Sequence, residues 1–153
     1  MNLYEFLLAV HILMAVIWVG GAFTNQILAI RAQRSGDPKA MAQFAGEAEW
    51  VGMRVFLPAS IVLLLAGIWL VIEGDWGFDK LWIILGIAGF AFSVLVGSLY
   101  LGPESGRIKA LMTERGPEDA EVNARISKIF LISRIELVIL LLIVVNMAIK
   151  PGS

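Results

Sequence analysis

Four long apolar stretches decide what this chain can fold into. They cover residues 6–23, 55–72, 81–101 and 129–149. Each is close to the ~20 residues that an α-helix needs to cross ~30 Å of hydrocarbon. The chain is also 59% hydrophobic and only 16% charged, well below the ~25% charged residues of an average soluble protein. Together these features predict a helical membrane protein.

The stretches predict one domain over residues 1–153, an all-α transmembrane four-helix bundle. We place its spans at about 4–30, 51–73, 80–101 and 127–149. The residues before the first stretch contain no Lys or Arg, whereas a secretory signal peptide begins with a positively charged region. We therefore expect the first helix to be retained. The lipid bilayer is the expected partner of the chain, and we expect no nucleic acid partner.

Positive charge is distributed unevenly between the two ends of such a bundle. Most of it lies in two connections, at Arg31, Arg34, Lys39, Arg107, Lys109, Arg115, Arg125 and Lys128. Because loops rich in Lys and Arg stay in the cytoplasm, these connections are predicted to be cytoplasmic. Both termini should then lie on the outer side of a bacterial inner membrane, which the chain crosses several times.

The two basic connections also carry signals for helix starts. Asp37 precedes Pro38, and both Pro103 and Pro117 are followed by acidic residues. Proline fits the first turn of a helix, and acidic residues interact favourably with its N-terminus. We therefore predict that these connections are helical extensions of the spans and not flexible linkers.

Small residues recur every fourth position in the third stretch, at Gly89, Ser93 and Gly97. Such a stripe lets a neighbouring helix backbone approach closely. We expect it to pack within the bundle, with a homodimer interface as the alternative.

The first stretch contains the only histidine of the chain, His11. Steps of three and four residues place it on one helix face with Met14, Trp18, Gly21 and Asn25. Because an ionisable side chain within a span marks a candidate functional site, we predict that this face lines an interior site. The alternative is that His11 forms only a hydrogen bond to a neighbouring helix.

Two charges, Arg134 and Glu136, lie in the fourth stretch. At ~100° per residue they point to nearly opposite helix faces, so they cannot pair with each other. Arg54 lies in the same cytoplasmic half and is long enough to approach Glu136. These residues are predicted either to serve a buried ligand or to form a structural ion-pair network, with Arg54 extending to the interface.

Helix geometry separates His11 from Arg134 by ~10 Å in depth. This spacing suits haem b, with His11 as the metal ligand and with Arg54 and Arg134 near the propionates, since Arg binds carboxylates through two hydrogen bonds. Met14 shares the face of His11 and cannot reach the opposite side of the ring. This predicts iron that is five-coordinate, or that takes its second axial ligand from water or a second subunit. The chain has no cysteine, which excludes thiolate and iron–sulfur sites.

Short motifs give the chain a resemblance to known families. They are His11, Trp18, Gly20 and Gly21, then Lys80 with Trp82, and the ending NMAIKPG. The pattern resembles a bacterial family of predicted four-helix integral membrane proteins of unknown function. It also distantly resembles the HemJ-type protoporphyrinogen oxidases and the copper-resistance D-type membrane domain. The HemJ-type resemblance implies a haem b ligand at His11 and important roles for Lys80 and Arg134.

Other functions stay open at this stage. The small size and the stripe of small residues fit an accessory subunit or assembly factor of a larger membrane complex. His11 with Met14 and Met147 fits copper handling, because thioether and imidazole are soft ligands. No nucleophile pairs with His11 in the sequence, which disfavours a hydrolytic enzyme, but the residues do not distinguish a redox enzyme from a binding protein.

Overall fold

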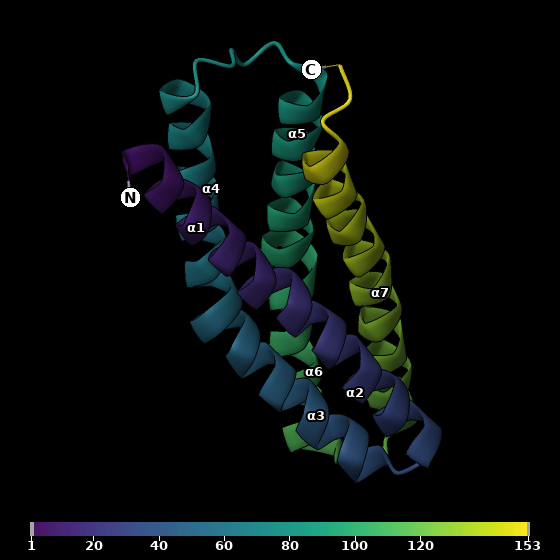
Figure 1. Ribbon diagram of the computed structural model, residues 1–153. Coiled ribbons are helices and arrows are strands. Elements are labelled where there is room, and N and C mark those ends of the chain that lie inside the picture. The colour runs from purple at the N-terminus through teal and green to yellow at the C-terminus, as the bar shows by residue number, and fades with distance from the viewer. Residues whose placement is uncertain (1, 153) are drawn as a thin grey trace.

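The computed structural model describes residues 2–152, and this part of the chain forms four long helices joined by short connections (Figure 1). They span Leu3–Ser35, Pro38–Glu73, Leu81–Arg115 and Ala120–Ile149, and each is long and apolar enough to cross a membrane. The prediction of an all-helical protein with four membrane-spanning helices is confirmed. Each helix is longer than the apolar stretch within it.

Three of the four helices contain one π-helical turn, where an extra residue widens the helix. In chain order the elements are α1 (Leu3–Ala15), η1 (Val16–Gly20), α2 (Gly21–Ser35), α3 (Pro38–Val51), η2 (Gly52–Phe56), α4 (Leu57–Glu73), α5 (Leu81–Val96), η3 (Gly97–Leu101), α6 (Gly102–Arg115) and α7 (Ala120–Ile149).

Proline explains two of these π-turns. A proline within a helix has no N–H for the carbonyl four residues earlier, and its ring clashes with that carbonyl. The carbonyls concerned belong to Arg54, four residues before Pro58, and to Leu99, four residues before Pro103. Both lie within π-turns, η2 and η3, where the widened turn relieves the clash. The third, η1, ends at Gly20, and glycines are a common cause of helix irregularity.

The π-turns η1 and η2 lie side by side in the first helical hairpin. Their middle residues, Trp18 and Arg54, are equally far along the chain from the turn at Gly36, and the two elements are in contact. A Cβ added to Gly21, next to η1, would meet the ring of Phe56 in η2. The absence of a side chain at Gly21 therefore lets the two widened turns pack together.

The basic connections are helical, as predicted, and are reduced to two tight turns. Asp37 accepts a hydrogen bond from the backbone N–H of Lys39 at 2.9 Å, with Pro38 in the first turn. Asp119 caps α7 in the same way, through Glu121 and Val122. Pro103 lies in the first turn of α6, which continues the helix Leu81–Arg115 through η3. Pro117 departs from the prediction, because it lies in the turn before α7 and not in the first turn of a helix.

The end of the bundle that carries these turns has its own hydrophobic core. Its buried members are Ala29, Met41, Ile108, Val122, Ile126, Ile129 and Phe130. Val122 and Ile126 are 0% exposed, whereas many apolar side chains within the spans face outward. Outward apolar side chains are expected where the surrounding solvent is lipid. The bundle thus combines a lipid-facing part with an extension that buries its apolar side chains internally.

Two residues of the small-residue stripe, Gly89 and Ser93, pack α5 against α7. The prediction of close packing within the bundle is therefore confirmed for these two residues. A Cβ added to Gly89 would lie 2.5 Å from Cδ1 and 2.6 Å from Cγ1 of Ile143, and Ser93 is only 1% exposed. Gly97 departs from the prediction, because it lies in η3 with no other group within 4 Å of an added Cβ. The contact instead continues toward the other end of α5, where Gly86 lies against Met147.

We expect Gly89→Ala to destabilise the bundle relative to Gly97→Ala. Both substitutions improve helix propensity by about 1 kcal/mol, but only the first forces a methyl group into Ile143, and such overpacking costs about 1–3 kcal/mol. Thermal unfolding in detergent, followed by circular dichroism, measures the difference. Equal unfolding midpoints for the two variants would contradict this account of the α5–α7 contact.

Candidate functional site

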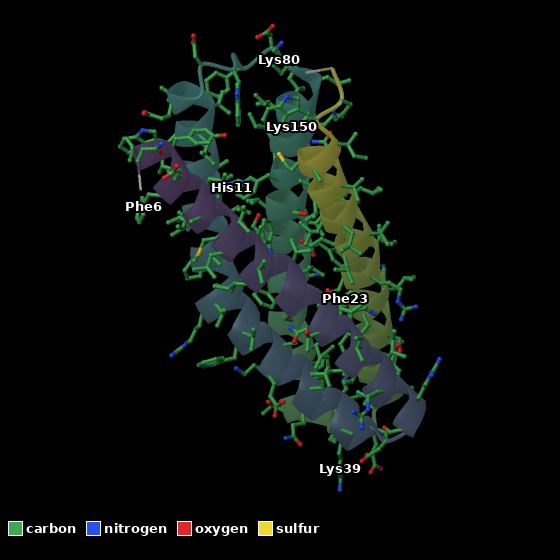
Figure 2. The ribbon with its side chains drawn as sticks, viewed as in Figure 1. Phe6, His11, Phe23, Lys39, Lys80 and Lys150 are labelled. Atoms are coloured by element: carbon green, nitrogen blue, oxygen red, sulfur yellow. The ribbon has the colours of Figure 1, made fainter. Side chains whose placement is uncertain are left out.

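The imidazole of His11 contacts the backbone of α4. Its Nδ1 lies 3.0 Å from the carbonyl oxygen of Leu63. Because a carbonyl oxygen can only accept, Nδ1 carries a proton and donates it. Figure 2 shows His11 on α1 at the level where this helix passes α4. The interhelical hydrogen bond that the sequence suggested for His11 is therefore present.

A glycine on α4 makes room for this ring. A Cβ added to Gly67 would lie 2.9 Å from Cε1 and 3.1 Å from Nδ1 of His11. Gly67 is also the residue four positions after Leu63, so its side chain would cover the Leu63 carbonyl. The missing side chain exposes that carbonyl and lets the imidazole lie against the helix.

The second ring nitrogen of His11, Nε2, forms no hydrogen bond within the part of the chain that the structure describes. With Nδ1 protonated and the ring neutral, Nε2 presents a lone pair. The described residues thus provide a hydrogen-bond partner for one ring nitrogen of His11. The other ring nitrogen is free to accept a proton or to bind a metal.

Further along the same face, the helix presents an aromatic wall. Trp18 is buried in η1 and meets Phe90 of α5 edge to face, with ring centroids 5.6 Å apart. Met14, between His11 and Trp18, is half-buried. The predicted stripe of His11, Met14 and Trp18 therefore faces the other helices.

The predicted approach of Arg54 to Glu136 is wrong. Arg54 is exposed and lies over the ring of Trp50, with its guanidinium carbon 5.4 Å from the ring centroid. Because Trp50 is four residues earlier, this partner lies on the same helix. Glu136 is half-buried and lies beside Ser93 of α5.

The predicted site residues therefore do not gather in a single site. His11, Met14 and Trp18 stay together on one face, whereas Arg134 is exposed and forms no ion pair within residues 2–152. Lys80 lies at the end of the bundle where α1 begins and α7 ends, in a cavity shared with Lys150. Among the described residues, no group of three or more His, Cys, Asp or Glu side chains is placed to hold a metal ion.

An ion-pair network between α6 and α7 escaped the sequence analysis. The buried carboxylate of Glu104 accepts from Arg125 at 2.7 Å, with Arg107 at 3.7 Å. Arg125 also contacts Glu121 at 3.0 Å, and Glu121 contacts Arg115 at 2.8 Å. The local signals are the four-residue spacing of Glu121 and Arg125 and the three-residue spacing of Glu104 and Arg107. The contact between Glu104 and Arg125 has no local signal, because it forms only once the two helices meet.

Arg125→Met should lower the unfolding temperature more than Arg107→Met. The first substitution leaves the buried Glu104 carboxylate without its close partner, and an unpaired buried charge is strongly destabilising. The second removes only a longer contact from an exposed arginine, which contributes little. Thermal unfolding of the two variants in the same detergent tests this order, and the reverse order would contradict it.

The comparisons with known proteins place the chain in a family but do not assign an activity. No matching curated protein and no matching solved structure was found. The family described as predicted integral membrane protein (DUF2269) matches residues 5–151, nearly the whole chain. With its four apolar helices, the chain is an integral membrane protein of the bilayer and belongs to this DUF2269 family.

Proposed function

We propose that this protein binds haem b or a related porphyrin in the membrane, with Nε2 of His11 as the axial ligand. The observation that carries the proposal is the hydrogen bond from Nδ1 of His11 to the Leu63 carbonyl. A histidine that binds a metal usually donates its other ring N–H to a carbonyl or carboxylate, which fixes the ring and makes the ligating nitrogen more basic. His11 has this arrangement.

The donor set fits a haem better than a metal ion bound by the protein alone. Haem iron needs one protein nitrogen because the macrocycle supplies four, whereas the described residues offer no cluster of ligating side chains. Trp18, further along the same face of α1, and Phe90 of α5 supply two aromatic rings that meet edge to face. When bound, haem would supply an iron centre for electron transfer or for binding a small ligand.

A single histidine predicts five-coordinate iron. Met147 lies against Gly86 of α5, and Met53 lines a cavity near the basic end of the bundle, so neither thioether is placed with His11. Arg54 and Arg134 are exposed and form no ion pair within the described residues. No carboxylate of the described residues therefore competes for either guanidinium group with a propionate that reaches the helix surface, although Arg54 already lies over the ring of Trp50.

An absorption spectrum of the protein purified in mild detergent tests the proposal. We expect a Soret band, either as purified or after addition of hemin, and we expect His11→Ala to lose it. Gly67→Ala should weaken the band, because the added methyl group displaces the imidazole from the Leu63 carbonyl. Thr24→Ala is the matched control, because this exposed side chain lies on the same helix and bonds only to the Gly20 carbonyl. A wild-type protein that shows no Soret band under either condition would refute haem binding.

We also propose that the protein lies in a bacterial inner membrane with both ends of the chain outside. The support is the excess of Lys and Arg at the end that carries the turns at Gly36 and Gly116, because the positive-inside bias keeps such ends in the cytoplasm.

Single cysteines can test this orientation directly, because the chain has none of its own. Asp79→Cys, in the α4–α5 connection, should react with a membrane-impermeant maleimide in intact spheroplasts. Ser35→Cys, beside the opposite turn, should react only in inverted vesicles or after permeabilisation. The opposite labelling pattern would show that the bundle is inserted the other way round.

A further inference from the structure

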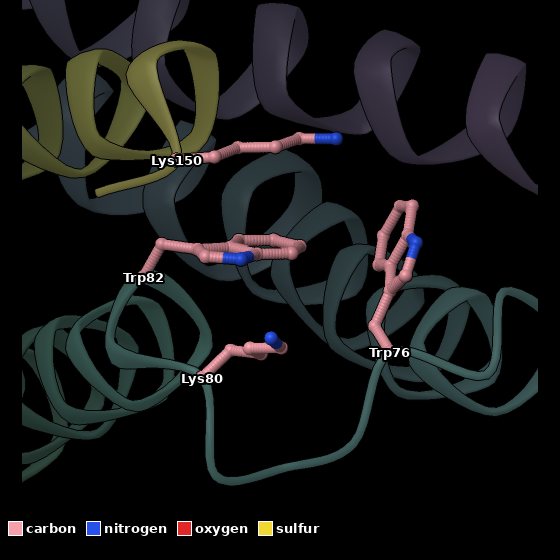
Figure 3. Close-up of a pocket in the computed structure, with 4 residues that line it drawn as sticks. All are labelled: Trp76, Lys80, Trp82 and Lys150. Atoms are coloured by element: carbon pink, nitrogen blue, oxygen red, sulfur yellow. The ribbon is translucent and has the colours of Figure 1, made fainter. Parts of the chain in front are cut away.

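The end of the bundle where α1 begins and α7 ends contains a cavity of about 230 Å³ lined by Trp76, Lys80, Trp82 and Lys150. The cavity is built from the α4–α5 connection, the start of α5 and the end of α7. Figure 3 shows the ring of Trp82 between the side chains of Lys150 and Lys80, with Trp76 opposite. Segments far apart in the sequence therefore meet here.

The ammonium group of Lys150 is held over two aromatic rings. Its Nζ lies 4.4 Å from the ring centroid of Trp76 and 5.1 Å from that of Trp82, which are favourable cation–π distances. The backbone of Lys150 is left-handed, with φ 49° and ψ 61°, and its N–H donates to the Asn146 carbonyl at 2.9 Å. A residue with a side chain rarely adopts this conformation. Here it ends α7 and lets the side chain reach the cavity.

The aromatic walls are fixed by the protein itself. Trp76 and Trp82 meet edge to face at 5.1 Å, and Tyr4 of α1 meets Trp76 at 5.8 Å. Asn146 of α7 donates to the Trp82 carbonyl at 2.7 Å, which joins the end of α7 to the start of α5. A ligand would therefore enter a cavity whose shape is already set.

The positive charges of the cavity are not neutralised by the described residues. Lys80 and Lys150 are both half-buried and form no ion pair with any residue in the range 2–152. The carboxylates of the α4–α5 connection, Glu73, Asp75 and Asp79, are exposed and do not bond to either ammonium group. The side chains of two lysines thus line a small, aromatic-walled cavity, and neither lysine has a carboxylate partner among residues 2–152.

We propose that this cavity binds the phosphate group of an anionic lipid headgroup or of a small phosphate solute. A phosphate accepts hydrogen bonds from several donors at once, and lysine binds it as a point charge. Tryptophan residues lie preferentially at the level of lipid headgroups. Phe78 and Leu81, next to the cavity in sequence, are exposed apolar residues that acyl chains can cover. The proposal does not depend on haem binding.

Native mass spectrometry of the full chain in nonionic detergent tests the proposal with phosphatidylglycerol and phosphatidylcholine as probes. We expect the wild-type protein to retain one phosphatidylglycerol in preference to phosphatidylcholine. Lys80→Gln should lower this retention about ten-fold, because a hydrogen bond to a charged group contributes about the free energy of a ten-fold change in affinity. Lys150→Gln should have a similar effect. Lys39→Gln, near the opposite end (Figure 2), should have none.

Two further measurements complete the test. One distinguishes loss of charge from loss of folding, and the other distinguishes a lipid ligand from a small phosphate solute. Lys80→Arg keeps the charge and should restore binding, and circular dichroism of every variant checks its fold. Displacement of the lipid by millimolar inorganic phosphate would identify a solute phosphate site, whereas retention would identify the lipid as the ligand. Equal phosphatidylglycerol retention by wild type and by folded Lys80→Gln and Lys150→Gln variants would overturn the proposal.

Discussion

In hydrocarbon there is no water to satisfy a backbone N–H or C=O group, so each must find its partner within the protein. The long helices of this chain meet that requirement even where proline interrupts the usual pattern. Pro58 and Pro103 each leave a carbonyl without its normal donor, and a π-turn lies at each of those carbonyls. The helices therefore continue through both prolines, and the positions of Arg54 and of the α6 extension follow from that continuity.

Local sequence signals predicted much of this fold. The lengths of the apolar stretches predicted the four helices. The caps at Asp37 and Asp119 could also be predicted, because each side chain bonds only to backbone N–H groups of the next few residues. The contact of Arg54 with Trp50 could also have been predicted from the sequence, since residues four apart share a helix face. The long reach of an arginine side chain favoured a distant partner, Glu136, over this nearer one.

Other features depend on how one helix is placed against another, and no single segment encodes that. Gly67 matters only because α1 crosses α4 at the level where His11 meets it. The burial of Glu104 with Arg125 requires α6 and α7 to be in register across the turn at Gly116. The two ends of the bundle thus differ in how their charges are partnered: Glu104 and Arg125 pair between α6 and α7, whereas Lys80 and Lys150 at the opposite end have no carboxylate partner among the described residues.

The extension beyond the apolar stretches has a further consequence. At the centre of its core are Val122 and Ile126, which precede the apolar stretch 129–149, so we expect water to be the solvent from which these two side chains are withdrawn. Burial there is driven by the hydrophobic effect, whereas α5 and α7 meet through close packing of small residues. The protein is therefore held together by two forces with different dependences on solvent. Urea, which weakens burial from water, should act first on the extension, and a change of detergent should act first on the spans.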